Sequence, residues 1–126
     1  MKVIFGKDRA EKVQDRLTIL ELDTFFQEGL EEPITAYAVI DAENVSIQDI
    51  PVMENHVKLH NTMMEEYRKQ NWEYVEQALE HLPGRWGGSV DSFYQSLSER
   101  IQKLKTEELP ESWTGVIINT TDNTVV

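Results

Sequence analysis

The stretch 52-VMENHVKLHNTMMEEYRKQNWEYVEQALEHLPGRWGGSVDSFYQSLSERIQKL-104 decides the fold, because its apolar residues recur at helical spacing in three successive segments. At about 100° per residue, the first segment gathers its apolar side chains into an arc roughly 160° wide. This arc contains Val52, Met53, His56, Val57, Leu59, His60, Met63, Met64 and Tyr67. The second arc contains Trp72, Tyr74, Val75, Ala78, Leu79 and Leu82, and a narrower third stripe contains Val90, Phe93, Tyr94, Leu97, Ile101 and Leu104. Three amphipathic helices are predicted, and such wide apolar faces must be covered by a further layer.

Helix-terminating and capping residues set the expected boundaries of these helices. Pro51 is typical of a first helical turn, and Asn71 marks a break between the first helix and the second. Pro83-Gly84 ends the second helix, because proline cannot continue it. Ser89 is expected to cap the third helix, with Asp91 in its first turn.

The first forty residues predict a small sheet. Residues 2–5 read as a short strand, and Asp8 with Glu11 has the spacing of a capping box at the start of a short helix. Residues 18–40 read as a β-hairpin. Apolar and polar residues alternate with period two over 18–26, and a turn that contains Gly29 and Pro33 precedes the next apolar run. The segment 113–118 is expected to add a strand, and 120–126 a tail.

Side-chain alternation assigns the two faces of this hairpin. In the first strand Leu20, Leu22 and Phe26 are expected on one face, with Glu21 and Asp23 on the other. The second strand is expected to place Ile34, Ala36, Ala38 and Ile40 on a shared face. The two small alanines would let a helix approach the sheet closely.

Length and composition predict one α+β domain over residues 1–126. Its sheet-forming part, 1–40, would be a small, mainly antiparallel sheet packed against the three-helix part, 52–104. The 40% hydrophobic and 28% charged residues are typical of a soluble globular protein. Without a signal sequence, a membrane span or any cysteine, the chain is expected in the cytoplasm, which means the host cytoplasm if it is viral.

The net charge of −11 argues against direct binding to a nucleic-acid backbone. Nine of the acidic residues lie between Leu17 and Val57, where neither lysine nor arginine occurs. A solvated surface is the commoner explanation of such a run. The sharper alternative is an acidic surface that binds a basic partner or imitates nucleic acid.

Six short segments together resemble a family of small proteins of T4-like marine phages, the cyanophages, to which no function is assigned. They are TILELDTF (18–25), TAYAVI (35–40), KLH (58–60), EYRKQNW (66–72), the Gly-Arg-Trp-Gly-Gly turn (84–88) and DSFYQSL (91–97). The resemblance covers residue 1 to about residue 101. It implies a virus-encoded protein and brings no catalytic motif.

A second resemblance is local. EGLEEPITAYAVI (28–40) is similar to the last hairpin of class III nucleotide cyclases, and EYRKQNWEYVEQALEHL (66–82) with ESWTGV (111–116) to the helical extension that follows them. The spacing in that extension also resembles one tetratricopeptide helix pair, but no second copy is present. Cyclase activity is not implied, because the metal-binding aspartates belong to strands that this chain is too short to hold.

His56 and His60 are the candidates for a polar or metal site, since histidines at i and i+4 can share a metal ion. His81 or Glu21 would have to supply a third ligand. Because both rings project from the apolar stripe, buried histidines held by hydrogen bonds, or a histidine pair in an interface, are the expected alternatives. The sequence predicts no cofactor, and the glycines at 84, 87 and 88 lack the remainder of a phosphate-binding loop.

Three aromatic residues, Tyr67, Trp72 and Trp86, are the candidates for partner binding. For Trp86 the alternative is a lid on the core. The wide helical faces are expected to leave some side chains uncovered in a monomer, from the set Met63, Met64, Tyr67, Trp72, Tyr74 and Trp86. The functional prediction is therefore a non-enzymatic protein that binds a host or viral protein and forms a homodimer. The alternative is a small-ligand or metal-dependent enzyme that uses His56 and His60.

Overall fold

The computed structural model describes residues 1–15, 17–27, 29 and 31–119, and it has an α+β fold. The N-terminal part forms β1 (Lys2–Phe5), α1 (Lys7–Val13), β2 (Thr18–Gln27) and β3 (Ile34–Ile40). The remainder forms two 3-10 turns, η1 (Ala42–Asn44) and η2 (Ile50–Val52), the helices α2 (Met53–Arg68), α3 (Trp72–His81) and α4 (Asp91–Leu104), and the strand β4 (Ile117–Asn119). The predicted fold class is confirmed. The tail expected at 120–126 lies outside the described residues.

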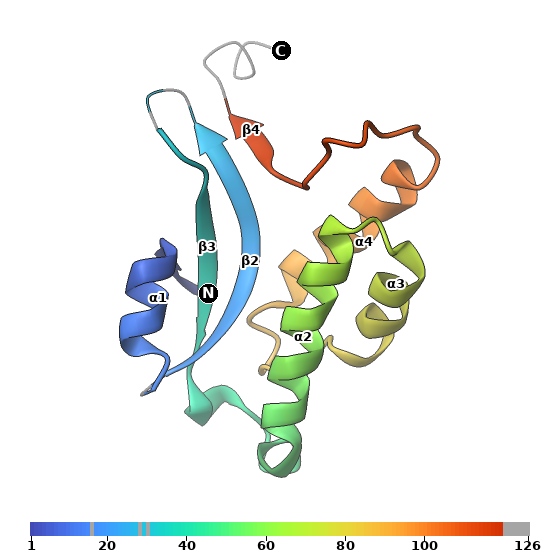
Figure 1. The fold of residues 1–126 in the computed structure, drawn as a ribbon. Coiled ribbons are helices and arrows are strands. Elements are labelled where there is room, and N and C mark those ends of the chain that lie inside the picture. The colour runs from blue at the N-terminus through green and yellow to red at the C-terminus, as the bar shows by residue number, and fades with distance from the viewer. Residues whose placement is uncertain (16, 28, 30, 120–126) are drawn as a thin grey trace.

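The sheet has the strand order β1-β3-β2-β4. β3 pairs antiparallel with β1 and with β2, whereas β4 pairs parallel with β2. Since β1 and β2 both run opposite to β3, they run parallel to each other, and α1 is the crossover between them. α1 lies on one side of the sheet, and α2, α3 and α4 lie on the other (Figure 1).

The hairpin is confirmed, but one of its strands is bulged. Leu20 pairs with Ala38, whereas the register shifts by one residue between Glu21 and Thr24. A bulge reverses which side chains face the core beyond it. The expected face of Phe26 is therefore wrong: Phe25, opposite Ile34, is the residue that packs against the core. The expected face of Asp23 is wrong for the same reason, and its side chain is buried.

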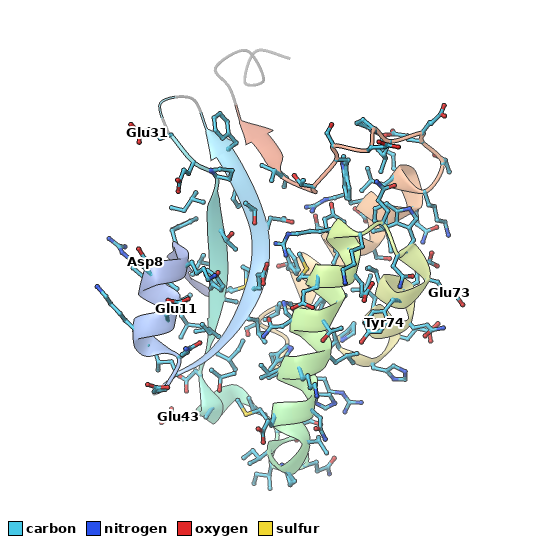
Figure 2. The ribbon with its side chains drawn as sticks, in the orientation of Figure 1. Asp8, Glu11, Glu31, Glu43, Glu73 and Tyr74 are labelled. Atoms are coloured by element: carbon cyan, nitrogen blue, oxygen red, sulfur yellow. The ribbon has the colours of Figure 1, made fainter. Side chains whose placement is uncertain are left out.

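The helix junctions follow the sequence in part. Asn71 caps α3, because its side chain accepts a hydrogen bond from the backbone N–H of Tyr74 at 3.4 Å. Ser89 does not cap α4; its hydroxyl donates to the carbonyl of Trp86 at 3.0 Å. The capping box at Asp8 is also absent, since α1 begins at Lys7 and both carboxylates lie along the exposed helix (Figure 2).

The core lies between the sheet and the three helices, and it covers more aromatic surface than the sequence suggests. Met63, Met64 and Trp86 are fully buried, and Tyr67 is 3% exposed. Of the six residues from which some were expected to stay uncovered, these four are covered, whereas Trp72 and Tyr74 are partly exposed. The segment after α4 supplies much of the missing cover, because Trp113 packs against this core. The homodimer stays a prediction, which depends on Trp72 and Tyr74 rather than on the four covered side chains.

Substitution of Ala38 by leucine is expected to lower the free energy of unfolding by about 1–3 kcal/mol. Ala38 is fully buried opposite Leu20, and a larger side chain there would overpack the contact between sheet and helices. Val39→Leu is the control, because the adjacent side chain points to the other face and is only partly buried. Urea titration of the three proteins measures the difference, and equal midpoints would contradict the assigned packing.

Candidate functional site

Four polar groups form a continuous chain in the core. His60 is fully buried in α2, and its Nδ1 lies 2.9 Å from the hydroxyl of Tyr94 in α4. The indole N–H of Trp86 donates to the same hydroxyl at 2.7 Å. His60 Nε2 lies 2.5 Å from the backbone carbonyl oxygen of Glu21 in β2. The chain therefore links both parts of the molecule through its centre.

The direction of each hydrogen bond follows from the partners. The carbonyl of Glu21 only accepts, so His60 must carry its proton on Nε2. Nδ1 then accepts from the Tyr94 hydroxyl, which in turn accepts from Trp86. Burial lowers the pKa of His60 to about 4, and burial raises the pKa of Tyr94. His60 is thus a neutral histidine whose two nitrogens are both bonded within the protein.

His56 has a different environment from His60. Its ring packs edge-on against Trp86, with 6.3 Å between ring centroids, and its Nδ1 is buried without a hydrogen-bond partner. Burial and the charge of Arg85 lower the pKa of His56. The histidine pair expected from the i, i+4 spacing does not form a shared ligand set, because neither nitrogen of His60 is free.

The residues considered for a third ligand are also placed elsewhere. Glu21 contacts His60 through its backbone, and its carboxylate forms an ion pair with Arg68. His81 lies exposed at the end of α3. Over the described ranges, no group of three histidine, cysteine or acidic side chains is placed to hold a metal ion.

The three aromatic candidates are mostly interior. Trp86 is the lid on the core rather than an exposed anchor, because it is fully buried. Tyr67 and Trp72 pack edge-on against Trp113, with centroid distances of 5.4 and 5.6 Å. Gly115 permits this packing, since a Cβ atom there would lie 2.9 Å from the Tyr67 ring. Tyr67 and Trp86 therefore offer no surface to a partner, and Trp72 is only partly exposed.

An ion pair that the sequence did not suggest joins the bulge of β2 to α4. Both amino groups of Arg100 donate to the Asp23 carboxylate, at 2.7 and 3.0 Å. The guanidinium also lies 6.0 Å from the centroid of the Tyr67 ring. In the sequence, Arg100 is recognisable only as an arginine on a predicted amphipathic helix. This position does not identify the acidic residue with which it pairs.

Some of the acidic residues between Leu17 and Val57 form ion pairs within the fold. Three of its nine carboxylates pair with arginines from the helical part: Glu21 with Arg68, Asp23 with Arg100 and Asp49 with Arg85. Other acidic residues, including Glu31, Glu43 and Glu73, project from separate parts of the surface (Figure 2). The acidic surplus is therefore spread around the molecule.

The exposed large apolar side chains of the described residues are not those that the sequence predicted; besides Met1 and Phe5, they come from residue 17 and the segment 47–52. Leu17, Ile47, Ile50 and Val52 are all exposed, and Ile47 is 85% exposed. Leu17 and Ile50 line opposite sides of an open hollow of about 590 Å³ between the start of β2 and the start of α2. We call this hollow the Leu17 groove; its apolar lining is Leu17, Ile19, Ile50, Met53 and Val57, and its charged lining is Asp15 and Glu54.

The stability of the fold is expected to fall as the pH drops from about 6.5 towards 4. The folded pKa of His60, about 4, is below the unfolded value near 6.5, so in this window the unfolded chain binds a proton that the folded chain does not. His60→Gln should therefore flatten the slope of unfolding free energy against pH. His81→Gln, which replaces an exposed histidine, is the control. Equal slopes in wild type and His60→Gln would contradict a neutral, buried His60.

The described helices are each too short or too polar to cross a lipid bilayer. Comparison of the chain with protein-family models, with curated proteins and with solved structures finds no match.

Proposed function

We propose that this protein acts by binding another protein, and that the Leu17 groove is the contact surface. The observation that carries the proposal is the exposed apolar lining of this groove, where Leu17 is 43% and Ile50 is 51% exposed. Contiguous exposed apolar surface is a common mark of a protein-binding site. Ile47 and Val52, three and two residues from Ile50 in the chain, are also exposed.

The enzyme alternative has weaker support than binding. It depended on His56 and His60 acting together, and both nitrogens of His60 are committed to Tyr94 and Glu21. The partner residues expected from the sequence, Tyr67 and Trp86, are replaced in the proposal by the residues of the Leu17 groove. The proposal also includes two expectations from the sequence, that a phage encodes the protein and that it acts in the host cytoplasm. Its partner is then a host or viral protein.

Affinity capture from a cyanobacterial lysate tests this function when groove variants are compared with a matched control. The groove variant is the double substitution Leu17→Asp and Ile50→Asp. Phe5→Asp is the control, because Phe5 is 50% exposed and lies at the far end of β1 from Leu17. A partner retained by wild type and Phe5→Asp but lost by the groove variant is the expected result. Equal capture by all three proteins would overturn the proposed surface.

A further inference from the structure

The Leu17 groove exposes part of a strand edge. One edge of β2 pairs with β3, and among the described residues the opposite edge pairs with β4 only from Phe25 to Gln27. At Glu21 this second edge is closed by α2. Asn61 Oδ1 accepts from the backbone N–H of Glu21 at 3.1 Å, and His60 donates to its carbonyl at 2.5 Å. The second edge of β2 is therefore hydrogen-bonded by β4 at the end of the strand and by α2 at Glu21.

Ile19 lies on the same edge, beyond the reach of both elements. It pairs with Val39 in the register that pairs Glu21 with Tyr37. Residues of an antiparallel pair alternate between bonding to the neighbouring strand and pointing away from it. The backbone N–H and C=O of Glu21 point away from β3, towards α2. Ile19 lies two residues before Glu21 in the same register, so its N–H and C=O also point away from β3. Over the described residues, no hydrogen bond from α2 or from a loop reaches them.

The surroundings of this open edge suit an extended chain. β2 and α2 approach each other at Glu21 and diverge towards the start of α2 (Figure 1), and the Leu17 groove lies in this opening. Ile50, Met53 and Val57 form the wall opposite the strand. Exposed strand edges readily accept a further strand, since the backbone groups supply the affinity and alternate side chains the specificity.

Charge restricts the partner further. Asp15 and Glu54 are the charged side chains among the described residues that line the groove, and both are exposed. A ligand carboxylate placed here would be repelled, whereas a lysine or arginine flanking the apolar positions would be attracted. The net charge of −11 acts in the same direction at longer range.

We propose that the Leu17 groove binds an extended segment of its partner, which adds to the sheet as a strand beside Ile19. Alternate apolar side chains of this segment contact Ile50, Met53 and Val57, and its lysine or arginine residues lie near Asp15 and Glu54. This inference rests on the proposed function, because it names the kind of segment that the same groove binds.

Selection of a displayed library of random dodecapeptides on the wild-type protein tests the inference. Peptides that also bind Leu17→Asp/Ile50→Asp are removed. The retained peptides are expected to alternate apolar residues with lysine or arginine. In the best synthetic peptide, N-methylation should weaken binding about tenfold at the one backbone amide that donates to the Ile19 carbonyl, and much less at the two neighbouring amides, whose N–H groups point away from β2.

Variants at Ile19 give an independent measurement. Ile19→Pro removes the N–H at the open edge, and the β2–β3 ladder is spared because that N–H points away from β3. Peptide affinity should fall about tenfold in Ile19→Pro and stay close to wild type in Ile19→Val, which keeps the N–H. Thermal unfolding of both variants checks that the sheet is intact, and slower hydrogen exchange of the Ile19 amide in the peptide complex checks the contact directly.

The outcomes separate this inference from the proposed function. Retained peptides with apolar residues at i, i+3 and i+4, and no single amide whose N-methylation weakens binding more than that of its neighbours, would show a helix in the groove. That result would overturn strand addition and keep the groove as a binding surface. If every selected peptide also bound Leu17→Asp/Ile50→Asp, so that none was retained, the proposed function and the inference would both fail.

Discussion

Substitution of Trp86 by alanine is expected to lower the free energy of unfolding by about 3–5 kcal/mol. Trp86 is fully buried, so alanine would leave a cavity lined by the core. The substitution also removes the donor to the Tyr94 hydroxyl and the ring against which His56 packs. Urea unfolding followed by circular dichroism measures the change.

Trp86→Phe separates the two contributions of this side chain. Phenylalanine keeps most of the ring volume but lacks the N–H, so the hydrogen-bond loss should cost about 1–2 kcal/mol in addition to a smaller packing loss. A loss in Trp86→Ala no greater than in Trp86→Phe would contradict the central packing of the indole. Trp72→Ala is a further comparison, because that ring is only partly buried.

Substitution of Asp23 by alanine is expected to cost about 3 kcal/mol. Asp23 is 7% exposed, and it accepts both hydrogen bonds from Arg100. Among the described residues, its removal would leave a largely buried guanidinium with the weak 3.4 Å hydrogen bond to the Tyr67 hydroxyl and the contact with the Tyr67 ring. Most of this cost comes from the unpaired charge of Arg100, because the protein interior solvates a charge less well than water does.

A double-mutant cycle tests that reason. Arg100→Met alone should also destabilise the fold, but the double substitution of Asp23 and Arg100 should cost clearly less than the sum of the single changes. Glu76→Ala is the control, because the Glu76–Lys105 pair is exposed and should contribute less than about 1 kcal/mol. Additive losses in the cycle would show that Asp23 and Arg100 act independently.

The positions of the three long helices along the chain could be predicted from local sequence. Apolar spacing predicted α2, α3 and α4, and the structure places Met63, Val75 and Leu97 from these stripes in one core. The break expected at Asn71 separates α2 from α3, and Asn71 also caps α3. Such features depend on contacts within a few residues, so the sequence contains the information needed to predict them.

The bulge in β2 shows where local alternation stops being sufficient. Strict period two placed Asp23 with Glu21, yet the structure buries Asp23 against Arg100, which lies 77 residues away in the chain. Nothing within the strand indicates the shift. It depends on the pairing with β3 and on an arginine that only the tertiary fold brings near.

The sequence by itself determined the α+β class, the hairpin and the three amphipathic helices, because periodicity and turn residues act locally. It also identified His60 as a residue of the apolar face. Only the tertiary structure decided that His60 bonds to Tyr94 and Glu21, that Trp86 is covered, and that the exposed apolar surface lies at Leu17 and Ile50. The physical reason is that burial and hydrogen-bond partners depend on which distant elements pack together, and amphipathic spacing states only that a face must be covered.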